Sequence, residues 1–152
     1  MKMKMRTSFA LLWLLVVIGP LPSAASLGGD VSSVQADQAH LQATVRLQRT
    51  AQYTVHEMQA PSGQVVREYV APTGKVFAVG WQGPAFPNLR QILGSYYEQL
   101  QVVQPNRRAN RRSVVIRQPG LVFESAGHLR SFVGKAYVPN LVPEGVSAGQ
   151  LK

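Results

Sequence analysis

The sequence predicts an α+β fold, with an antiparallel sheet (a meander) and two amphipathic helices packed on one of its faces. Several segments are rich in β-branched and aromatic residues and are joined by short turns that contain proline and glycine, which is typical of antiparallel strands. Two other segments repeat apolar residues every three or four positions, which is typical of amphipathic helices. The predicted order along the chain is helix, three strands, helix, three strands.

Residues 1–25 have the pattern of a signal peptide. Three cations precede an uninterrupted apolar run at residues 9–18, and small residues at 23–25 offer a cleavage site. An apolar run of this length is too short to span a bilayer, which needs about 20 residues. We therefore expect cleavage of this segment, no transmembrane anchor afterwards, and a periplasmic or secreted protein.

The composition favours one domain that is stabilised by packing alone. The chain has 152 residues and no cysteine, so it can form neither disulfides nor thiolate metal sites. We expect a single α+β domain over residues 26–138 and, because proline and glycine recur after it, a loose tail over residues 139–152. The formal net charge is +9, and loss of the three cations in residues 1–25 leaves 13 Lys and Arg against 7 Asp and Glu, a net charge of +6. This charge favours anionic partners, although solubility is the simpler explanation.

The first half of the chain is predicted to hold a helix and a three-stranded meander. Ser32 and Gln35 match a capping box, and the helix that they begin is expected to run to about Arg46. Turns with proline and glycine at 61–63 and 72–74 then separate three strands. These strands are expected near residues 52–58, 64–70 and 75–81.

The second half repeats this order. Apolar residues spaced by three and four positions over 89–103 predict one long helix with a single buried face. A polar, arginine-rich connection follows at 104–112. Turns at 118–120 and 125–127 then separate the last strands, because Pro-Gly and small polar residues favour turns. These strands are expected at residues 113–117, 121–124 and 129–138.

Catalytic and metal-binding motifs are absent from the sequence. His40, His56 and His128 form no ligand pattern, and there is no nucleophile elbow, P-loop or dinucleotide motif, so we expect no metal and no cofactor. A cross-strand pair of Glu57 and Glu68 could supply coupled carboxyl groups for acid–base chemistry, but nearby arginines are as able to neutralise them. Glu124 is a third candidate acid–base residue. An enzyme is therefore disfavoured.

Arginines form the best candidate binding site. Guanidinium groups bind phosphate and carboxylate through two hydrogen bonds, so a cluster of them favours an anionic partner, although a solvated basic loop is the simpler explanation. No aromatic residue interleaves the cluster, so base stacking is unsupported and no nucleic acid is expected. Aromatic residues on the first meander could instead stack on sugar rings or pack in the core. The arginines are Arg107, Arg108, Arg111, Arg112 and Arg117, and the aromatic residues are Tyr69, Phe77 and Trp81.

One set of residues is distinctive beyond its periodicity. It comprises Val66-Arg67-Glu68-Tyr69-Val70, Pro72, Gly74, Val76-Phe77-Ala78-Val79, Trp81, Gly83-Pro84, Leu89, Leu93-Gly94 and Tyr96, after a Leu27-Gly28-Gly29 start. Over roughly residues 27–100 the chain thereby resembles an uncharacterised family of small exported proteins of Gram-negative bacteria, domain of unknown function 2844. The resemblance implies export and a single domain, and it carries over no activity, ligand or catalytic residue.

These observations favour a non-catalytic envelope protein that binds a protein partner or an anionic glycan or lipopolysaccharide. The alternative is a small envelope-glycan hydrolase or transferase that uses Glu57, Glu68 or Glu124 as acid and base. The sequence leaves the oligomeric state open.

Overall fold

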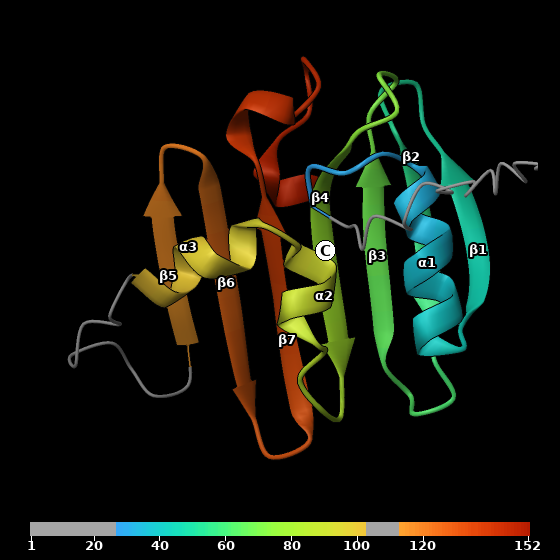
Figure 1. Cartoon of the computed structure of the whole chain (residues 1–152), viewed down its shortest axis with the longest axis vertical. Helices are drawn as coiled ribbons and strands as arrows, with labels where there is room; N and C mark the ends of the chain where they lie inside the picture. Colours follow the sequence, from blue (N-terminus) through green and yellow to red (C-terminus); the bar gives the residue numbers. More distant parts are fainter. Residues whose placement is uncertain (1–26, 103–112) are drawn as a thin grey trace, which may run out of the picture.

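The predicted α+β class is confirmed, and the strands form one antiparallel sheet built from two meanders (Figure 1). The computed structural model describes residues 27–102 and 113–152. The first meander contains β1 (Thr44–Arg49), β2 (Thr54–Gln59), β3 (Val65–Val70) and β4 (Val76–Gly83), and the second contains β5 (Ser113–Gln118), β6 (Leu121–His128) and β7 (Ser131–Tyr137). They join where β4 pairs with β7, so the sheet order is β1-β2-β3-β4-β7-β6-β5.

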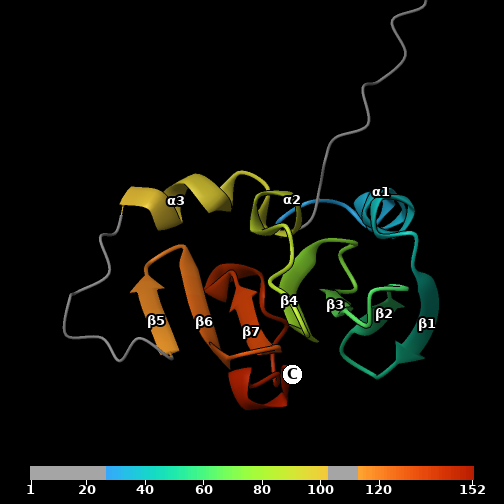
Figure 2. The same ribbon diagram turned by 90° about the horizontal axis from the view of Figure 1, so that it is seen from below.

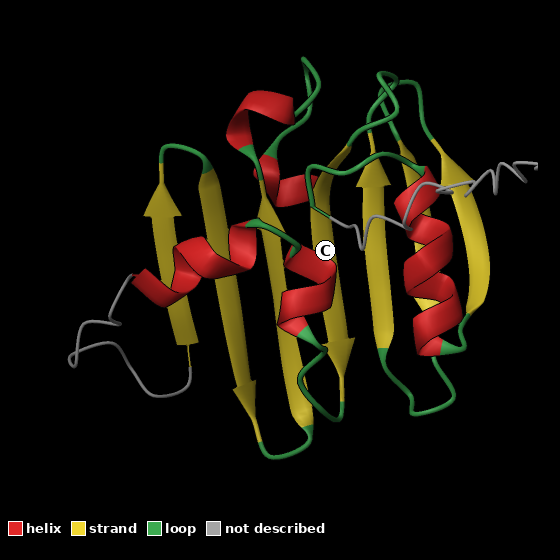
Figure 3. Cartoon of the chain, viewed as in Figure 1, coloured by secondary structure: helices red, strands yellow, loops and turns green. Residues whose placement is uncertain are grey.

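The two faces of the sheet are covered by different parts of the chain. The helices α1 (Ser32–Leu41), α2 (Leu89–Leu93) and α3 (Tyr96–Val102) lie on one face, which we call the helix face (Figures 2 and 3). The C-terminal segment, residues 139–152, crosses the opposite face, which we call the tail face. This segment contains the short 3-10 helices η1 (Pro139–Leu141) and η2 (Ala148–Gln150).

Alternation along the strands divides the apolar residues between two cores. On the helix face, Met58, Val66 and Trp81 are buried among side chains of the three helices. On the tail face, Tyr69 and Phe77 are buried together with residues of the C-terminal segment. The central strands are therefore apolar on both sides, which explains why β3 and β4 have nearly continuous runs of buried residues.

The seam between the two meanders depends on a glycine. Trp81 of β4 is 1% exposed and lies opposite Gly134 of β7. A Cβ atom at Gly134 would overlap the indole ring of Trp81. The indole also packs on Phe123 of β6, with 5.5 Å between the ring centroids. Absence of a side chain at Gly134 thus lets the tryptophan lie flat across the seam.

The first helix is shorter than predicted, and a fourth strand follows it. The helix ends at Leu41, where Gln42 adopts φ = 50° and its N–H bonds back to the carbonyl of Ala39. The expected helix to about Arg46 is wrong because Val45 continues the spacing of the helix yet belongs to β1. This strand is largely exposed, so its residues give little of the alternating signal that marks half-buried strands.

The second half also differs in detail. Gly94, with φ = 53° and ψ = −130°, divides the expected long helix into α2 and α3, so three helices are described where two were predicted. The turn expected at 125–127 is wrong, because these residues continue β6 and the chain turns at Leu129 and Arg130. Small residues there serve close packing, since a Cβ at Gly127 would meet the ring of Phe132.

The C-terminal segment is packed and differs from the loose tail that its prolines and glycines predict. Leu151 is 3% exposed, and Leu141, Val142 and Val146 contact the buried residues of the tail face. Without this segment, the aromatic residues of β3 and β4 would be open to solvent. Apolar residues that recur among the turns therefore fix the segment on the sheet.

Candidate functional site

A groove lies on the tail face where the C-terminal segment stops short of the sheet edge. We call it the tail groove. It has a volume of about 320 Å³ and is lined by Val115, Glu124, Ala126, Val133, Lys135 and Leu151, among others. Most of its wall is apolar, and the charged residues Glu124 and Lys135 come from two neighbouring strands. A concave, mostly apolar surface with a few placed polar groups is the usual form of a binding site.

The register of the second meander brings these side chains together. Val115 of β5 lies opposite Glu124 of β6, and Glu124 lies opposite Lys135 of β7. Ala126 and Val133 form the next pair on the same face. Because side chains two residues apart share one face of a strand, the short hairpins align these groups in two rows across three strands.

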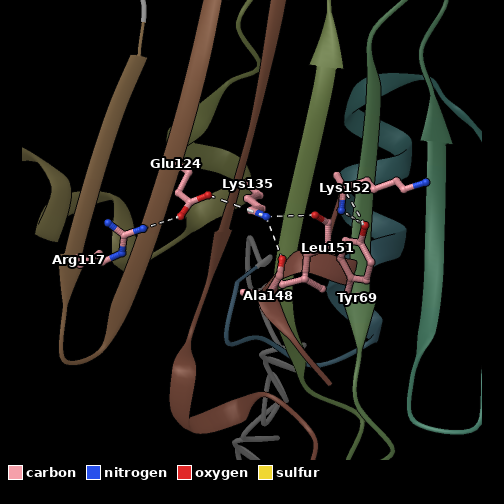
Figure 4. Close-up of polar contacts among 7 residues, drawn as sticks. All are labelled: Tyr69, Arg117, Glu124, Lys135, Ala148, Leu151 and Lys152. Carbon is pink, nitrogen blue, oxygen red and sulfur yellow. Dashed lines mark hydrogen bonds and ion pairs between the residues drawn. The ribbon is translucent and has the colours of Figure 1, made fainter. Parts of the chain in front are cut away.

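The charged row fixes the C-terminal segment in place (Figure 4). Lys135 Nζ donates to the carbonyl oxygens of Ala148 at 2.9 Å and Leu151 at 3.3 Å, and it lies 3.9 Å from Glu124 Oε2. Arg117 donates to Glu124 Oε1 at 3.2 Å. Two cations thus share one carboxylate. Since the Arg117 side chain is 68% exposed, its ion pair is worth little and its guanidinium is open to a further anion.

A tyrosine holds the far end of the groove. The Tyr69 hydroxyl donates to the Lys152 carbonyl at 3.0 Å and accepts from the Lys152 N–H at 2.9 Å (Figure 4). Burial raises the pKa of this hydroxyl, so it stays protonated and keeps its donor role. The Lys152 main chain also passes directly over Gly80, where a Cβ atom would overlap it. The wall formed by residues 151 and 152 is therefore fixed from two sides.

The apolar part of the groove is open. Val115 is 52% exposed and Val133 is 49% exposed, although both lie on a sheet face that is otherwise well packed. Both valines lie on paired strands, but β5 is an outermost strand of the described sheet. An exposed apolar surface beside an edge strand is a feature that proteins ordinarily cover or use.

Of the predicted arginine site, the structure places one member. Arg117 lies at the rim of the tail groove, paired with Glu124. Arg107, Arg108, Arg111 and Arg112 fall at residues 103–112 and lie outside the described residues. The signal peptide at 1–25 lies outside them as well. The groove itself was missed, because it needs the position of the C-terminal segment, which sequence periodicity did not predict.

The three candidate acid–base glutamates do not come together. Glu57 lies on the tail face opposite Arg67, which donates to it at 2.7 Å. Glu68 follows Arg67 and so lies on the helix face, where it is fully buried. The expected Glu57–Glu68 pair is therefore not formed, because the register pairs each with another residue. Glu124 belongs to the tail groove.

A different carboxyl pair is present that sequence analysis missed. Glu68 of β3 and Asp37 of α1 adjoin one another in the helix-face core, each 0% exposed, and Asp37 Oδ1 accepts from Gln91 Nε2 at 2.8 Å. Burial raises the pKa of both carboxyl groups, that of Glu68 by more, and the neighbouring Asp37 raises it further. No protein group donates to the Glu68 oxygens in the described residues, so a proton shared by the two carboxyl groups would supply the hydrogen bond between them.

The remaining sequence candidates occupy structural positions. Tyr69, Phe77 and Trp81 are between 0% and 3% exposed and lie on two different faces, so they present no stripe for sugar stacking. Burial, with a smaller effect of Arg49, lowers the pKa of His56 in a hollow beside α1. Within residues 27–102 and 113–152, no three acidic or histidine side chains gather as metal ligands would.

Comparison with known sequences assigns a family without adding an activity. The part of the chain that the structure describes contains no helix long and apolar enough to cross a membrane. No curated protein and no solved structure shows significant similarity to the chain. The sequence profile of one family, described as "Protein of unknown function (DUF2844)", matches residues 23–151. The match includes both meanders, the buried carboxyl pair and the lining of the tail groove except Lys152. The chain belongs to this family.

Proposed function

We propose that this chain is an exported, non-catalytic envelope protein that binds an extended segment of a partner protein in the tail groove. The observation that carries the proposal is the half-exposed apolar floor beside β5. Val115 and Val133 are about half exposed in a groove of about 320 Å³. That volume accommodates a few side chains rather than a large cofactor.

The position of β5 supports an extended partner. It is an outer strand in the described sheet, and the alternating residues Ser113, Val115 and Arg117 are exposed. A strand added to a sheet edge gains main-chain hydrogen bonds, while alternate side chains enter the neighbouring surface. An added strand beside β5 would direct an apolar side chain toward Val115. Its specificity would come from the groove and its affinity largely from the backbone.

Charge supports an acidic group near that segment. Arg117 is exposed at the rim of the groove and shares Glu124 with Lys135, so two cations meet one carboxylate there. Lys135 is occupied by two carbonyl oxygens, whereas Arg117 has donors to spare. A carboxylate on the partner would form a charge-assisted pair with Arg117. This agrees with the anionic partner expected from the net charge.

The positions of the glutamates support binding over acid–base chemistry. An acid and base for glycan cleavage must face the same substrate, within about 5 to 9.5 Å of one another. Glu57 and Glu68 lie on opposite faces of the sheet, and Glu68 is 0% exposed. Glu124 is bridged by Lys135 and Arg117. The hydrolase alternative has no comparable observation in its favour.

One experiment tests export and binding together. The full chain is produced in a Gram-negative host, and an antibody detects it in the periplasmic fraction at the size expected after removal of residues 1–25. Cross-linking and immunoprecipitation from the same fraction then recover the partner. Val115→Asp places a charge on the groove floor. It should lower the amount of partner recovered at least tenfold, since burying a charge without a counter-ion is costly.

The matched control is Leu47→Asp, which changes an apolar residue of similar exposure, 49%, on β1 at the other edge of the sheet. It should keep the partner. Equal loss in both variants, or no loss in Val115→Asp, would contradict the groove as the binding site. Retention of the chain in the cytoplasm at full length would contradict export.

A further inference from the structure

We propose that the end of the sheet formed by the β6–β7 turn and the β4–α2 connection docks on a bilayer surface rich in anionic lipid. We call this surface the hairpin tip and define it as Leu129, Arg130, Phe86 and Phe132. In the proposed arrangement, Leu129 and Phe86 enter the boundary between headgroups and acyl chains, and Arg130 meets a headgroup phosphate. This inference uses a different surface from the tail groove and does not rest on the proposed partner protein.

Leu129 is the most exposed large apolar residue of the described chain. Its side chain is 94% exposed, compared with about half for the other exposed apolar residues. It is the first of the two residues that connect β6 to β7, so it projects beyond the sheet. A two-residue turn needs no leucine, because polar and small residues suit such turns better. The leucine side chain is therefore available to an apolar environment outside the protein.

Arg130 occupies the second position of the turn at a conformational cost. Its φ is 60°, a left-handed conformation in which glycine or asparagine is favoured. Arg130 has no ion pair among the described residues. An arginine side chain thus occupies a position that glycine would suit better, and its guanidinium group is free to bind an anion. Leucine and arginine together place an apolar group and a cation at one projecting point.

A second apolar group lies beside the turn. Phe86, in the connection from β4 to α2, is 49% exposed and packs on Phe132 of β7 with 4.6 Å between ring centroids. The two loops lie side by side at the lower end of the sheet in Figure 1. Phe132 thereby supports Phe86 from within the protein. Phenylalanine and leucine are among the residues that interfacial segments bury at the boundary between headgroups and acyl chains.

The charge around the hairpin tip favours an anionic lipid surface over other apolar partners. Residues 82–90 and 127–133 contain no aspartate or glutamate but contain Arg90, His128 and Arg130. A hollow of about 450 Å³ lies between the β6–β7 turn and Pro84, and Arg130 lines it. It offers space for a headgroup next to a cation. An acid-free surface with projecting apolar groups matches anionic lipid, whose surface attracts basic residues.

The test exploits the absence of cysteine in the chain. Leu129→Cys in the full chain gives a single site for an environment-sensitive fluorophore, and Leu47→Cys on β1 gives the matched control. Vesicles of phosphatidylcholine alone are compared with vesicles that contain phosphatidylglycerol. We expect a blue shift and a rise in intensity at residue 129 with phosphatidylglycerol vesicles, and no such change at residue 47. Because each position is measured separately, membrane binding by residues 1–25 would not imitate insertion of the tip.

Charge variants complete the test. Arg130→Gln in the labelled background should raise the lipid concentration for half-maximal signal about fivefold, since one basic residue near an anionic surface contributes about that factor. Arg46→Gln on β1 should leave it unchanged. A signal change at residue 129 that appears without lipid and grows with protein concentration would indicate a second copy of the chain instead and overturn the proposal. Equal changes at residues 129 and 47, or none at either, would overturn it as well.

Discussion

At the scale of single residues, the buried carboxyl pair is the most consequential feature. Asp37 and Glu68 tie α1 to β3, and Gln91 adds α2 to the same contact. Burial raises the pKa of both carboxyl groups. Hydrogen bonds from Glu68 and Gln91, and to a smaller extent the charge of His40, lower the pKa of Asp37, whereas no group lowers that of Glu68. The raised pKa values mean that the folded protein binds a proton at this pair more tightly than the unfolded chain does.

The sign of the pH effect follows from these shifts. Glu68 binds its proton more tightly in the folded than in the unfolded chain, so its contribution to the free energy of unfolding is full below about pH 4 and falls as the pH rises through its raised pKa. Glu68→Gln removes the titration while keeping an amide that can donate to Asp37. We expect this variant to gain about 1 to 3 kcal/mol at pH 8 relative to the wild type, and little at pH 4.

Urea denaturation at the two pH values measures this difference. Glu98→Gln, which changes an exposed glutamate of α3, serves as the control and should follow the wild type at both. A Glu68→Gln variant that loses stability at pH 8, or that depends on pH as strongly as the wild type, would show that the carboxyl group is not protonated in the core.

At the scale of elements, the C-terminal segment is held by a few contacts from one lysine and one tyrosine. Lys135→Met removes the donor to the Ala148 and Leu151 carbonyls while keeping an unbranched side chain. We expect a loss of about 1.5 to 3 kcal/mol, the range for hydrogen bonds to a charged group. We also expect faster amide hydrogen exchange at residues 148–152 than in the rest of the sheet.

Arg117→Met provides the comparison for that variant. Its ion pair with the same Glu124 is largely exposed, so the loss should stay below about 1 kcal/mol and the exchange of residues 148–152 should not change. If both variants released the segment equally, the charge of the row rather than the two carbonyl bonds would hold it.

The strands differ in how well the sequence predicts them. The strands β2, β3 and β4 are bounded by turns with proline and glycine and have clear β-branched runs, so their existence was predictable. β1 was not, because Val45 fits both a helical and an extended pattern and only pairing with β2 decides between them. The tail groove was beyond prediction for the same reason. Its walls come from three strands and residues 151 and 152, which no local pattern connects.

At the scale of the whole molecule, the two meanders depend on the seam between β4 and β7. Gly134→Ala would force a methyl group against the Trp81 ring, and overpacking of this kind costs about 1 to 3 kcal/mol. Gly120→Ala in the β5–β6 turn is the matched control, because nothing lies within 4 Å of a Cβ atom there. The midpoint of urea denaturation should fall for the first variant and stay near the wild type for the second.

The sheet order sets when this protein can fold. Residues 76–83 form the last strand of the first meander, yet their outer neighbour is residues 131–137, the last strand of the chain. Until that part of the chain arrives, β4 has an unpaired edge and Trp81 lacks its partner across the seam. Pairing between distant segments is slow because the intervening loop must close first. The seam can therefore close only once residues 131–137 are present, so any shorter piece of the chain leaves Trp81 without its neighbour at Gly134.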